Sequence, residues 1–399
     1  MRSTRFCVVN LGCKVNRVES DTIAAALMAQ GGVAVDEEDA ELVVVNTCTV
    51  TGEADKKARK AVRHALKSAP KADVVVTGCA VAINAEAYKA LDERVSVVQR
   101  AELLASLSDG RIADLMRLGE GFRTRVSVKV QDGCNRACTY CIVHVARGRS
   151  ASVPARDVLA ECERYLMRGV KELVLAGIDL GSYCDGDFKL ENLVETLLEL
   201  IDKNTPPGGQ PARIRASSLE PDSVSQGFID LMAKSGGRLC RHLHLPLQAG
   251  STKVLREMAR PYTADDFCGL VDSMYGAVPD LSLSTDIICG FPGESEEEFA
   301  ETLDIARRCR FSKIHVFPYS MRIGTPAAAR RDQVPPEVKA ARAARLRSLA
   351  DELRAEDLAR RAGSVELALV EGATALTESY HEISAPTGCA PGSLVPVIL

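Results

Sequence analysis

Several features that would point to a membrane or an extracellular protein are absent from this sequence of 399 residues. It contains no run of 18 apolar residues, so we expect no transmembrane helix. The N-terminal stretch has only a short apolar segment before a cysteine motif, which argues against a signal peptide. We therefore expect a cytoplasmic protein with no membrane partner.

The sequence also lacks a large excess of positive or negative charge. The formal net charge is only −4, so composition gives no global sign of a nucleic-acid partner, and local patches would have to bind one. The length predicts two or three domains, and a hydrophobic content of 46% is enough for sizeable cores. Fourteen cysteines in a chain of this kind suggest metal ligation rather than a disulfide framework.

One short loop holds three cysteines and lacks a fourth nearby. Cys134, Cys138 and Cys141 follow a predicted strand in which Val126, Val128 and Val130 alternate with polar residues. A closed structural zinc or iron–sulfur site normally uses four protein ligands, so three leave a position open for chemistry. The alternative is a zinc site with a distant fourth ligand.

Three further cysteines each follow a predicted strand. Residues 4–105 alternate between continuous apolar strands and helices, which indicates a parallel sheet covered on both faces. Cys13, Cys48 and Cys79 come directly after three of these strands. Because the carboxyl ends of parallel strands lie along one edge, we expect these cysteines to converge there as a second three-thiolate site. The alternative is three buried core cysteines.

The remainder of the chain predicts a barrel. A linker is expected at residues 106–123, and six strand–helix units then fit an open six-stranded partial barrel whose active site lies at the strand C-termini. The predicted strands cover residues 126–130, 172–176, 213–216, 242–245, 283–288 and 313–317. His242 and His244 alternate with leucines, so they share a face that points either into the barrel or into its wall.

The cysteine motifs resemble those of a known family. The C-x3-C-x2-C loop, with Tyr140 before its last cysteine, resembles the radical S-adenosylmethionine (radical SAM) enzymes, in which these cysteines hold a [4Fe–4S] cluster whose open iron binds SAM. The segments 12–16, 46–48 and 77–79 resemble the N-terminal domain of the methylthiotransferases, a radical SAM subfamily that carries an auxiliary [4Fe–4S] cluster on these cysteines. The resemblance covers nearly the whole chain. It implies two [4Fe–4S] clusters and SAM as cofactors.

Polar residues at the predicted strand ends are candidates for the SAM pocket, and each has the alternative of an ordinary satisfied turn residue. Glycines there let backbone amides approach a cofactor closely. The candidates are Gly177, Asp179, Ser218, Glu220, Gln248 and Asp286.

Two segments bear on RNA binding. Residues 330–361 predict a long charged helix with nine basic and six acidic residues, which is either an RNA contact or an ordinary solvated face. Residues 363–399 predict short strands at 365–370, 376–383 and 394–399 and resemble the small β-domain called TRAM, which helps bind RNA in this family. This segment contains no lysine or arginine, so its grip on phosphate is in doubt.

The resemblance implies an α/β chain with an N-terminal methylthiotransferase domain (1–107), a radical SAM core (120–361) and a short TRAM-like β-domain (362–399). The expected reaction is methylthiolation at C2 of N6-threonylcarbamoyladenosine (t6A) at position 37 in the anticodon stem-loop of tRNA, with a reductant such as flavodoxin or ferredoxin. Alternative substrates are isopentenyladenosine in tRNA and an aspartate of a ribosomal protein. A function of another class is an iron–sulfur electron-transfer or sensing protein.

Overall fold

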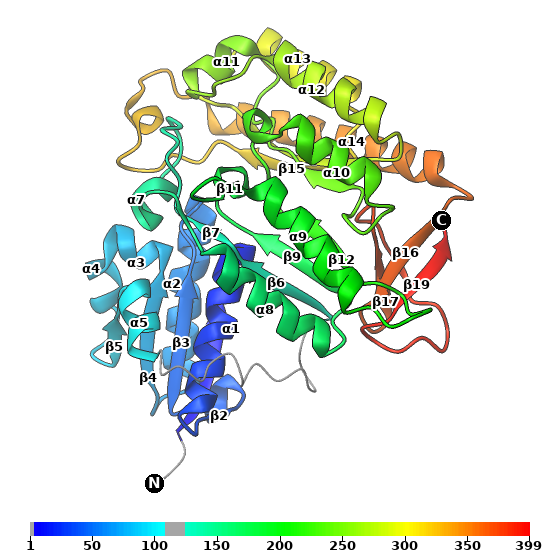
Figure 1. Ribbon diagram of the computed structural model, residues 1–399. Helices are drawn as coiled ribbons and strands as arrows, with labels where there is room; N and C mark the ends of the chain where they lie inside the picture. The colour runs from blue at the N-terminus through cyan, green and yellow to red at the C-terminus, as the bar shows by residue number, and fades with distance from the viewer. Residues whose placement is uncertain (1–3, 108–123) are drawn as a thin grey trace. The chain divides into compact units, whose positions relative to one another are not determined.

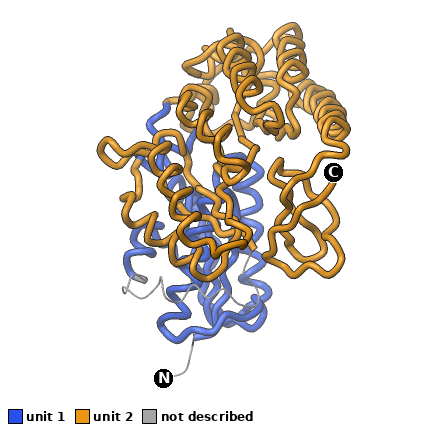
Figure 2. The backbone as a smooth tube through the Cα atoms, turned by 45° about the vertical axis from the view of Figure 1, so that its right-hand side comes forward, with its two compact units in different colours: residues 1–122, 132–136, 141–150 blue, residues 123–131, 137–140, 151–399 orange. Residues whose placement is uncertain are grey.

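The computed structural model describes residues 4–107 and 124–399, which fall into two compact units (Figures 1 and 2). Unit 1 takes residues 1–122, 132–136 and 141–150, and unit 2 takes residues 123–131, 137–140 and 151–399. The three-cysteine loop thus contributes segments to both units. Most of the expected linker at 106–123 lies outside the described residues.

Unit 1 is built on a parallel sheet of five strands in the order β2-β1-β3-β4-β5. Helices follow its strands, as the alternating pattern predicts. The strands are β1 (Arg5–Asn10), β2 (Val33–Ala34), β3 (Leu42–Thr47), β4 (Asp73–Gly78) and β5 (Val95–Val97). The helices are α1 (Lys14–Ala29), α2 (Gly52–Ser68), α3 (Cys79–Asn84), α4 (Glu86–Lys89), α5 (Arg100–Leu107) and α7 (Val143–Arg147).

Both faces of this sheet are covered, which explains the unbroken valine runs of its central strands. Val43, Val45 and Val74 lie in a core that includes Val62 of α2. On the opposite face, Val44 packs with residues of α1 such as Ile23. These side chains are almost fully buried, and each contributes about 1.5–3 kcal/mol by leaving water.

Unit 2 contains a partial barrel of six parallel strands, as predicted. Strands β6 (Arg125–Lys129), β9 (Glu172–Ala176) and β12 (Arg213–Ala216) form one sheet, and β13 (His242–His244), β14 (Ser282–Cys289) and β15 (Lys313–Pro318) form another. Isolated parallel bridges, Ile214 to Leu239 and Ser218 to His244, join the two sheets at β12 and β13. The barrel therefore runs in chain order from β6 to β15.

Helices follow the barrel strands and carry their apolar faces inward. They are α8 (Ala155–Met167), α9 (Leu190–Lys203), α10 (Gln226–Lys234), α11 (Thr252–Glu257), α12 (Ala264–Ala277), α13 (Glu296–Arg308) and α14 (Pro336–Arg361). Ser225, Thr263 and Ser295 cap α10, α12 and α13, since each side-chain oxygen accepts a backbone N–H from the first turn. Among the helices that the structure describes, none has both the length and the apolar character of a membrane span.

Several basic residues of segment 330–361 form ion pairs within unit 2. Arg342 is buried and donates to Glu294, while Arg345 pairs with Glu296. Arg361 pairs with Asp357 and with Glu366, which lies in the following strand. These guanidinium groups have carboxylate partners, whereas Arg347 on the same helix is exposed.

A four-stranded antiparallel sheet ends the chain, in the order β18-β17-β16-β19, and belongs to unit 2. Its strands are β16 (Val365–Val370), β17 (Thr374–Thr377), β18 (Glu382–Ser384) and β19 (Leu394–Ile398). The single strand predicted at 376–383 was therefore wrong. Tyr380 has a φ of 71° and lies in the turn between β17 and β18, where its ring stacks on His242 at a centroid distance of 4.5 Å.

This C-terminal sheet is joined to the barrel by a buried ionic network. Arg213 and Arg215 begin β12, and both donate to Glu172 at the start of β9, at 2.6 and 2.9 Å. Arg213 also donates to the carbonyls of Leu367 and Leu376, at 2.7 and 3.0 Å. Glu172 and Arg213 are the first residues of their barrel strands. The C-terminal sheet therefore closes the end of the barrel that lies opposite the strand C-termini.

The pKa of Glu172 shows how strongly the network holds it ionised. Burial alone would raise this pKa, but Arg215 and Arg213 outweigh it and lower the pKa to about 2. A carboxyl group with a depressed pKa stabilises the fold above its unfolded pKa of about 4.3. This contribution is lost as the pH falls from about 4.3 toward 2.

We expect Glu172→Gln to lower the free energy of unfolding of unit 2 by about 3–5 kcal/mol, because two buried guanidinium groups lose their carboxylate partner. Urea unfolding at pH 7 measures this, and the difference from wild type should shrink below pH 4. Glu371→Gln is the matched control, because the Arg125–Glu371 pair is partly exposed and should cost under about 1 kcal/mol. Equal losses in the two variants would contradict the assignment.

Candidate active site

The structure places Cys13, Cys48 and Cys79 at the carboxyl edge of the unit 1 sheet. Asn10 of β1 pairs with Asn46 of β3, and Asn46 pairs with Thr77 of β4, so the three strands end side by side. Cys13 is the N-cap of α1, Cys48 follows β3 directly, and Cys79 is the first residue of α3. Three cysteines far apart in the sequence thus lie together at one edge.

Glycines make this close approach possible. Gly12 has a φ of 120°, and a Cβ atom added there would lie 2.7 Å from Cys48 Cβ. Gly78 has a φ of 96°, and a Cβ atom there would lie 2.5 Å from Asn46 Oδ1. Only glycine adopts these conformations without strain, so the Gly-Cys dipeptides at 12–13 and 78–79 are requirements of the backbone.

Arg147 lies at the centre of this edge, although it comes from the three-cysteine loop. It ends α7, its side chain is 1% exposed, and its Nε donates to Cys79 Sγ at 3.2 Å. Its terminal nitrogens donate to Asn16 Oδ1 and to Glu19 at 3.1 Å. A further bond of 2.8 Å reaches Asp132. This one guanidinium group therefore ties the loop segment 141–150 to the sheet edge inside unit 1.

Burial and charge act in opposite directions on these groups. Burial raises the pKa of Cys79 to about 11, against the lowering effect of Arg147, and burial also raises the pKa of Cys48. Burial alone would lower the pKa of Arg147, but Cys79, Glu19 and Asp132 raise it above its ordinary value. Burial therefore favours the thiol form of Cys48 and Cys79, and a metal that binds them has to displace their protons.

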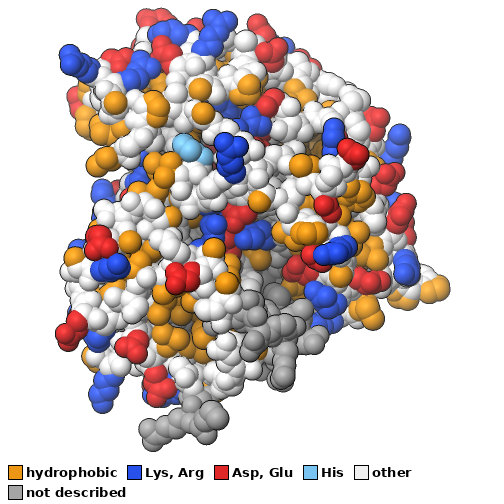
Figure 3. Space-filling model, turned by 60° about the vertical axis from the view of Figure 1, so that its left-hand side comes forward, with side chains coloured by type: hydrophobic (Ala, Val, Ile, Leu, Met, Phe, Trp, Pro, Cys, Tyr) orange, Lys and Arg blue, Asp and Glu red, His pale blue; other side chains and the backbone are white. Residues whose placement is uncertain are grey.

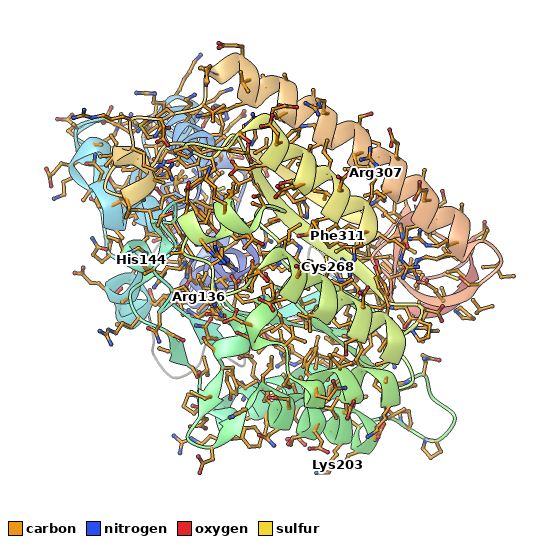
Figure 4. All side chains as sticks on the ribbon, turned by 90° about the horizontal axis from the view of Figure 1, so that it is seen from above. Arg136, His144, Lys203, Cys268, Arg307 and Phe311 are labelled. Atoms are coloured by element: carbon orange, nitrogen blue, oxygen red, sulfur yellow. The ribbon has the colours of Figure 1, made fainter. Side chains whose placement is uncertain are left out.

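The cysteines of the loop have their own hydrogen bonds. Backbone N–H groups of Arg136 and Val143 donate to the sulfur atoms of Cys134 and Cys141, each at 3.4 Å. In unit 2, Arg260 Nη1 donates to Cys138 Sγ at 3.3 Å. Donors aimed at sulfur are a common means of tuning iron–sulfur sites. Figure 4 labels Arg136 and His144, two residues of this loop.

The candidates for the SAM pocket lie at the C-terminal ends of the barrel strands or just below them. Gly177 and Asp179 follow β9, where the side-chain oxygen of Gln131 accepts the backbone N–H groups of residues 178 and 179, both at 2.9 Å. Glu220 follows β12 and pairs with Arg260, which also donates to Cys138. These residues share one neighbourhood in unit 2.

Ser218, Gln248 and Asp286 form a second group. Ser218 bridges to His244, and the backbone N–H of Gln248 donates to the carbonyl of Asp286 at 2.9 Å. Asp286 differs from the other candidates, because it lies within β14 and its carboxylate is 3.3 Å from His244 Nε2.

Sequence reasoning missed three buried groups of the site: Gln131, Arg147 and Arg260. Nothing in the local pattern distinguishes their side chains from surface residues, because burial comes from segments distant in sequence. Arg147 lies within six residues of a cysteine motif, and this proximity was the one available signal.

The other cysteines pack mainly as small apolar groups. Cys162, Cys240, Cys268, Cys289 and Cys309 are buried. Cys268 of α12, labelled in Figure 4, lies close to Cys309. All fourteen cysteines lie within the described residues, and none forms a disulfide there.

The cysteines at the sheet edge of unit 1 fit an iron–sulfur cluster by donor type, and the strand ends of the barrel in unit 2 fit a polar cofactor. Each triple offers soft thiolate ligands without a fourth cysteine in its motif, the donor set that suits iron–sulfur chemistry. Some buried polar side-chain atoms in these two regions have no hydrogen-bond partner among the described residues. Examples are Thr77 Oγ1 at the sheet edge, and Ser217 Oγ and the Tyr319 hydroxyl at the strand ends of the barrel.

A partial barrel of six parallel strands, with a three-cysteine loop after the first strand, defines the radical SAM class. Residues 128–306 match the Radical SAM superfamily, and residues 5–99 match the uncharacterized protein family UPF0004. Among solved structures, the radical SAM methyltransferase TsrM from Kitasatospora setae has a TM-score of 0.59 at 16% identity, covering 82% of this chain and 77% of its own, which supports the fold.

Curated relatives narrow the class. The threonylcarbamoyladenosine tRNA methylthiotransferase MtaB of Bacillus subtilis is 38% identical, over 87% of this chain and 80% of its own. MtaB of Aquifex aeolicus is 34% identical, over 98% of both chains. The tRNA-2-methylthio-N(6)-dimethylallyladenosine synthase of Carboxydothermus hydrogenoformans is 33% identical, over 95% of this chain and 90% of its own. The chain belongs to the radical SAM methylthiotransferase family and is a transferase.

We expect Arg147→Gln to lower the iron content after anaerobic reconstitution below that of the wild type, because Cys79 loses its donor and Glu19 and Asp132 keep only Arg100 as a partner. Iron analysis and electron paramagnetic resonance of the reduced protein measure this. Arg100→Gln is the control, because Arg100 pairs with the same two carboxylates. Full iron loading in Arg147→Gln would show that Arg147 is dispensable at this edge.

Proposed function

We propose that this enzyme adds a methylthio group to C2 of t6A at position 37 of tRNA. Relatives named for t6A and for dimethylallyladenosine are similarly close in identity, so relatedness alone does not select the substrate. The polar side chains of the barrel strands, above all His244 and Asp286, favour the polar threonylcarbamoyl group. An isopentenyl group would instead require an apolar pocket.

We place one [4Fe–4S] cluster on Cys134, Cys138 and Cys141 and a second on Cys13, Cys48 and Cys79. When bound, the first cluster would supply the electron that cleaves SAM. The second cluster would supply or present sulfur. We assign SAM to Gly177, Asp179, Ser218, Glu220 and Gln248 at the strand ends. The three-part division at residues 107, 120 and 362 is part of the same proposal.

The observation that carries this proposal is the position of Arg147. The loop that holds the first cysteine triple supplies the buried cation of the second, through a bond of 3.2 Å to Cys79. In unit 2, Arg260 plays a comparable part, because it contacts Cys138 and Glu220 together. These two arginines hold the cysteine sulfurs and their neighbours in fixed positions, as a site for ordered group transfer requires.

The proposed substrate implies a cytoplasmic enzyme that binds the anticodon stem-loop, with a small reductant such as flavodoxin or ferredoxin. On the face that Figure 3 shows, the Lys and Arg side chains are mixed with Asp and Glu side chains. The C-terminal segment 363–399 has no lysine or arginine. We therefore expect phosphate binding to rely on scattered arginines and lysines, with a modest dependence on salt.

Substitutions in the two cysteine triples should abolish different steps of the reaction. Cys138→Ala should abolish release of 5′-deoxyadenosine from SAM, because the first site loses a ligand. Cys48→Ala should keep that release but give no methylthiolated nucleoside, since only the second site is damaged. Chromatography of SAM products and mass spectrometry of digested tRNA measure the two outcomes. Cys184→Ser, which changes an exposed cysteine outside both triples, should keep both activities. Methylthiolated product at the wild-type rate from Cys48→Ala would rule out the second role.

The substrate is tested with reconstituted enzyme, SAM, a reductant and tRNA that carries either t6A or isopentenyladenosine at position 37. We expect kcat/KM to be at least about 100-fold higher for the t6A tRNA, because polar groups of the pocket stay unpaired against a hydrocarbon. Mass spectrometry of the nucleosides measures both rates in one mixture. Preference for the isopentenyl tRNA would reassign the substrate and leave the family chemistry intact.

A further inference from the structure

Three neighbouring strands of the barrel, β13, β14 and β15, each contribute one side chain to a close cluster. His244 ends β13, and Asp286 of β14 pairs in register with His315 of β15. One ligand atom from each of the three side chains lies within 4.8 Å of the other two. We call His244, Asp286 and His315 the strand triad.

The strand triad faces the interior of the barrel. Residues that alternate with it, such as Leu243, Ile287 and Ile314, are buried, and in a barrel wrapped by helices this outward face packs beneath the helices. The triad side chains are less buried, with exposures of 16% for His244 and 31% for Asp286. These three polar groups therefore keep access to solvent, unlike the buried residues that alternate with them.

Neighbouring groups fix the orientation of the triad. His244 Nδ1 lies 3.0 Å from Ser284 Oγ, and its Nε2 lies 3.3 Å from Asp286 Oδ1. Ser284 Oγ is also 3.0 Å from His242 Nε2, and Tyr380 of the C-terminal sheet stacks on that second imidazole. A recognition site needs this kind of support, since each polar group is held before a ligand arrives.

The chemistry of the triad limits what it can receive. Asp286 is an acceptor, and the imidazoles of His244 and His315 can each donate or accept. A hydrocarbon placed against Asp286 would displace water from the lone pairs that its contact with His244 does not use, and it would supply no donor, which is costly. A substituent with hydroxyl, amide N–H and carboxylate groups offers donors to Asp286 and acceptors to an imidazole N–H.

We infer that the strand triad reads the polar substituent of the modified adenosine. Asp286 accepts from the N–H and O–H groups of the substituent, and His315 donates to its oxygen atoms. The inference rests on the proposed function and makes it more specific. It also assigns Asp286 to the nucleic-acid substrate rather than to SAM.

The test uses anaerobically reconstituted full-length protein and synthetic anticodon stem-loops that carry t6A, isopentenyladenosine or plain adenosine at position 37. Fluorescence anisotropy gives the three dissociation constants, and equilibrium dialysis gives the affinity for SAM. His315→Phe and Asp286→Asn should each reduce the preference for t6A over plain adenosine about tenfold, the loss of one charge-assisted hydrogen bond. Asp304→Asn is the matched control, because Asp304 is an exposed carboxylate on α13, and it should leave the preference intact.

The outcomes separate this inference from the proposed function. A wild-type preference for t6A that survives in both triad variants overturns the inference alone. A wild-type preference for isopentenyladenosine overturns the proposed substrate and the inference with it. Loss of SAM affinity in Asp286→Asn would return that residue to the cofactor pocket. Tight binding of one Zn²⁺ per chain, lost in His315→Phe, would make the triad a metal site and also overturn the inference.

Discussion

The structure depends first on one buried cation. Arg147 is removed from water, and in exchange it bonds with Cys79, Asn16, Glu19 and Asp132. An unpaired buried guanidinium group would be costly, so its partners must be in place together. Those partners come from the sheet edge and from the loop, and the cation therefore fixes the position of the loop segment 141–150 within unit 1.

Other buried arginines also join segments that are distant in the sequence. Arg260 joins Glu220 to Cys138, and Arg213 and Arg215 join the barrel to the carbonyls of the C-terminal sheet. Arginine suits this use because it keeps its charge and presents several donors in a rigid fork. The packing of apolar side chains stabilises each layer, whereas these ionic contacts fix the positions of the loops and of the C-terminal sheet.

The C-terminal sheet gains a different role from this arrangement. It closes the N-terminal end of the barrel, and Tyr380 supports His242, which in turn contacts Ser284 below the strand triad. The sheet therefore serves the barrel directly, which is consistent with its lack of lysine and arginine. Removing it would expose buried Arg213 and Arg215, so truncation would test the stability of the barrel more than its binding of RNA.

The sequence by itself determined the layers of the fold and the places of the cysteines. Continuous apolar runs predicted a sheet covered on both faces, and the position of Cys13, Cys48 and Cys79 after three strands predicted that they meet at one edge. Tertiary structure alone decided the roles of Arg147 and Arg260, the turn at Tyr380 and the meeting of the strand triad. Each of these depends on charge or packing between segments far apart in sequence, and no local pattern records which distant group will neutralise a buried charge.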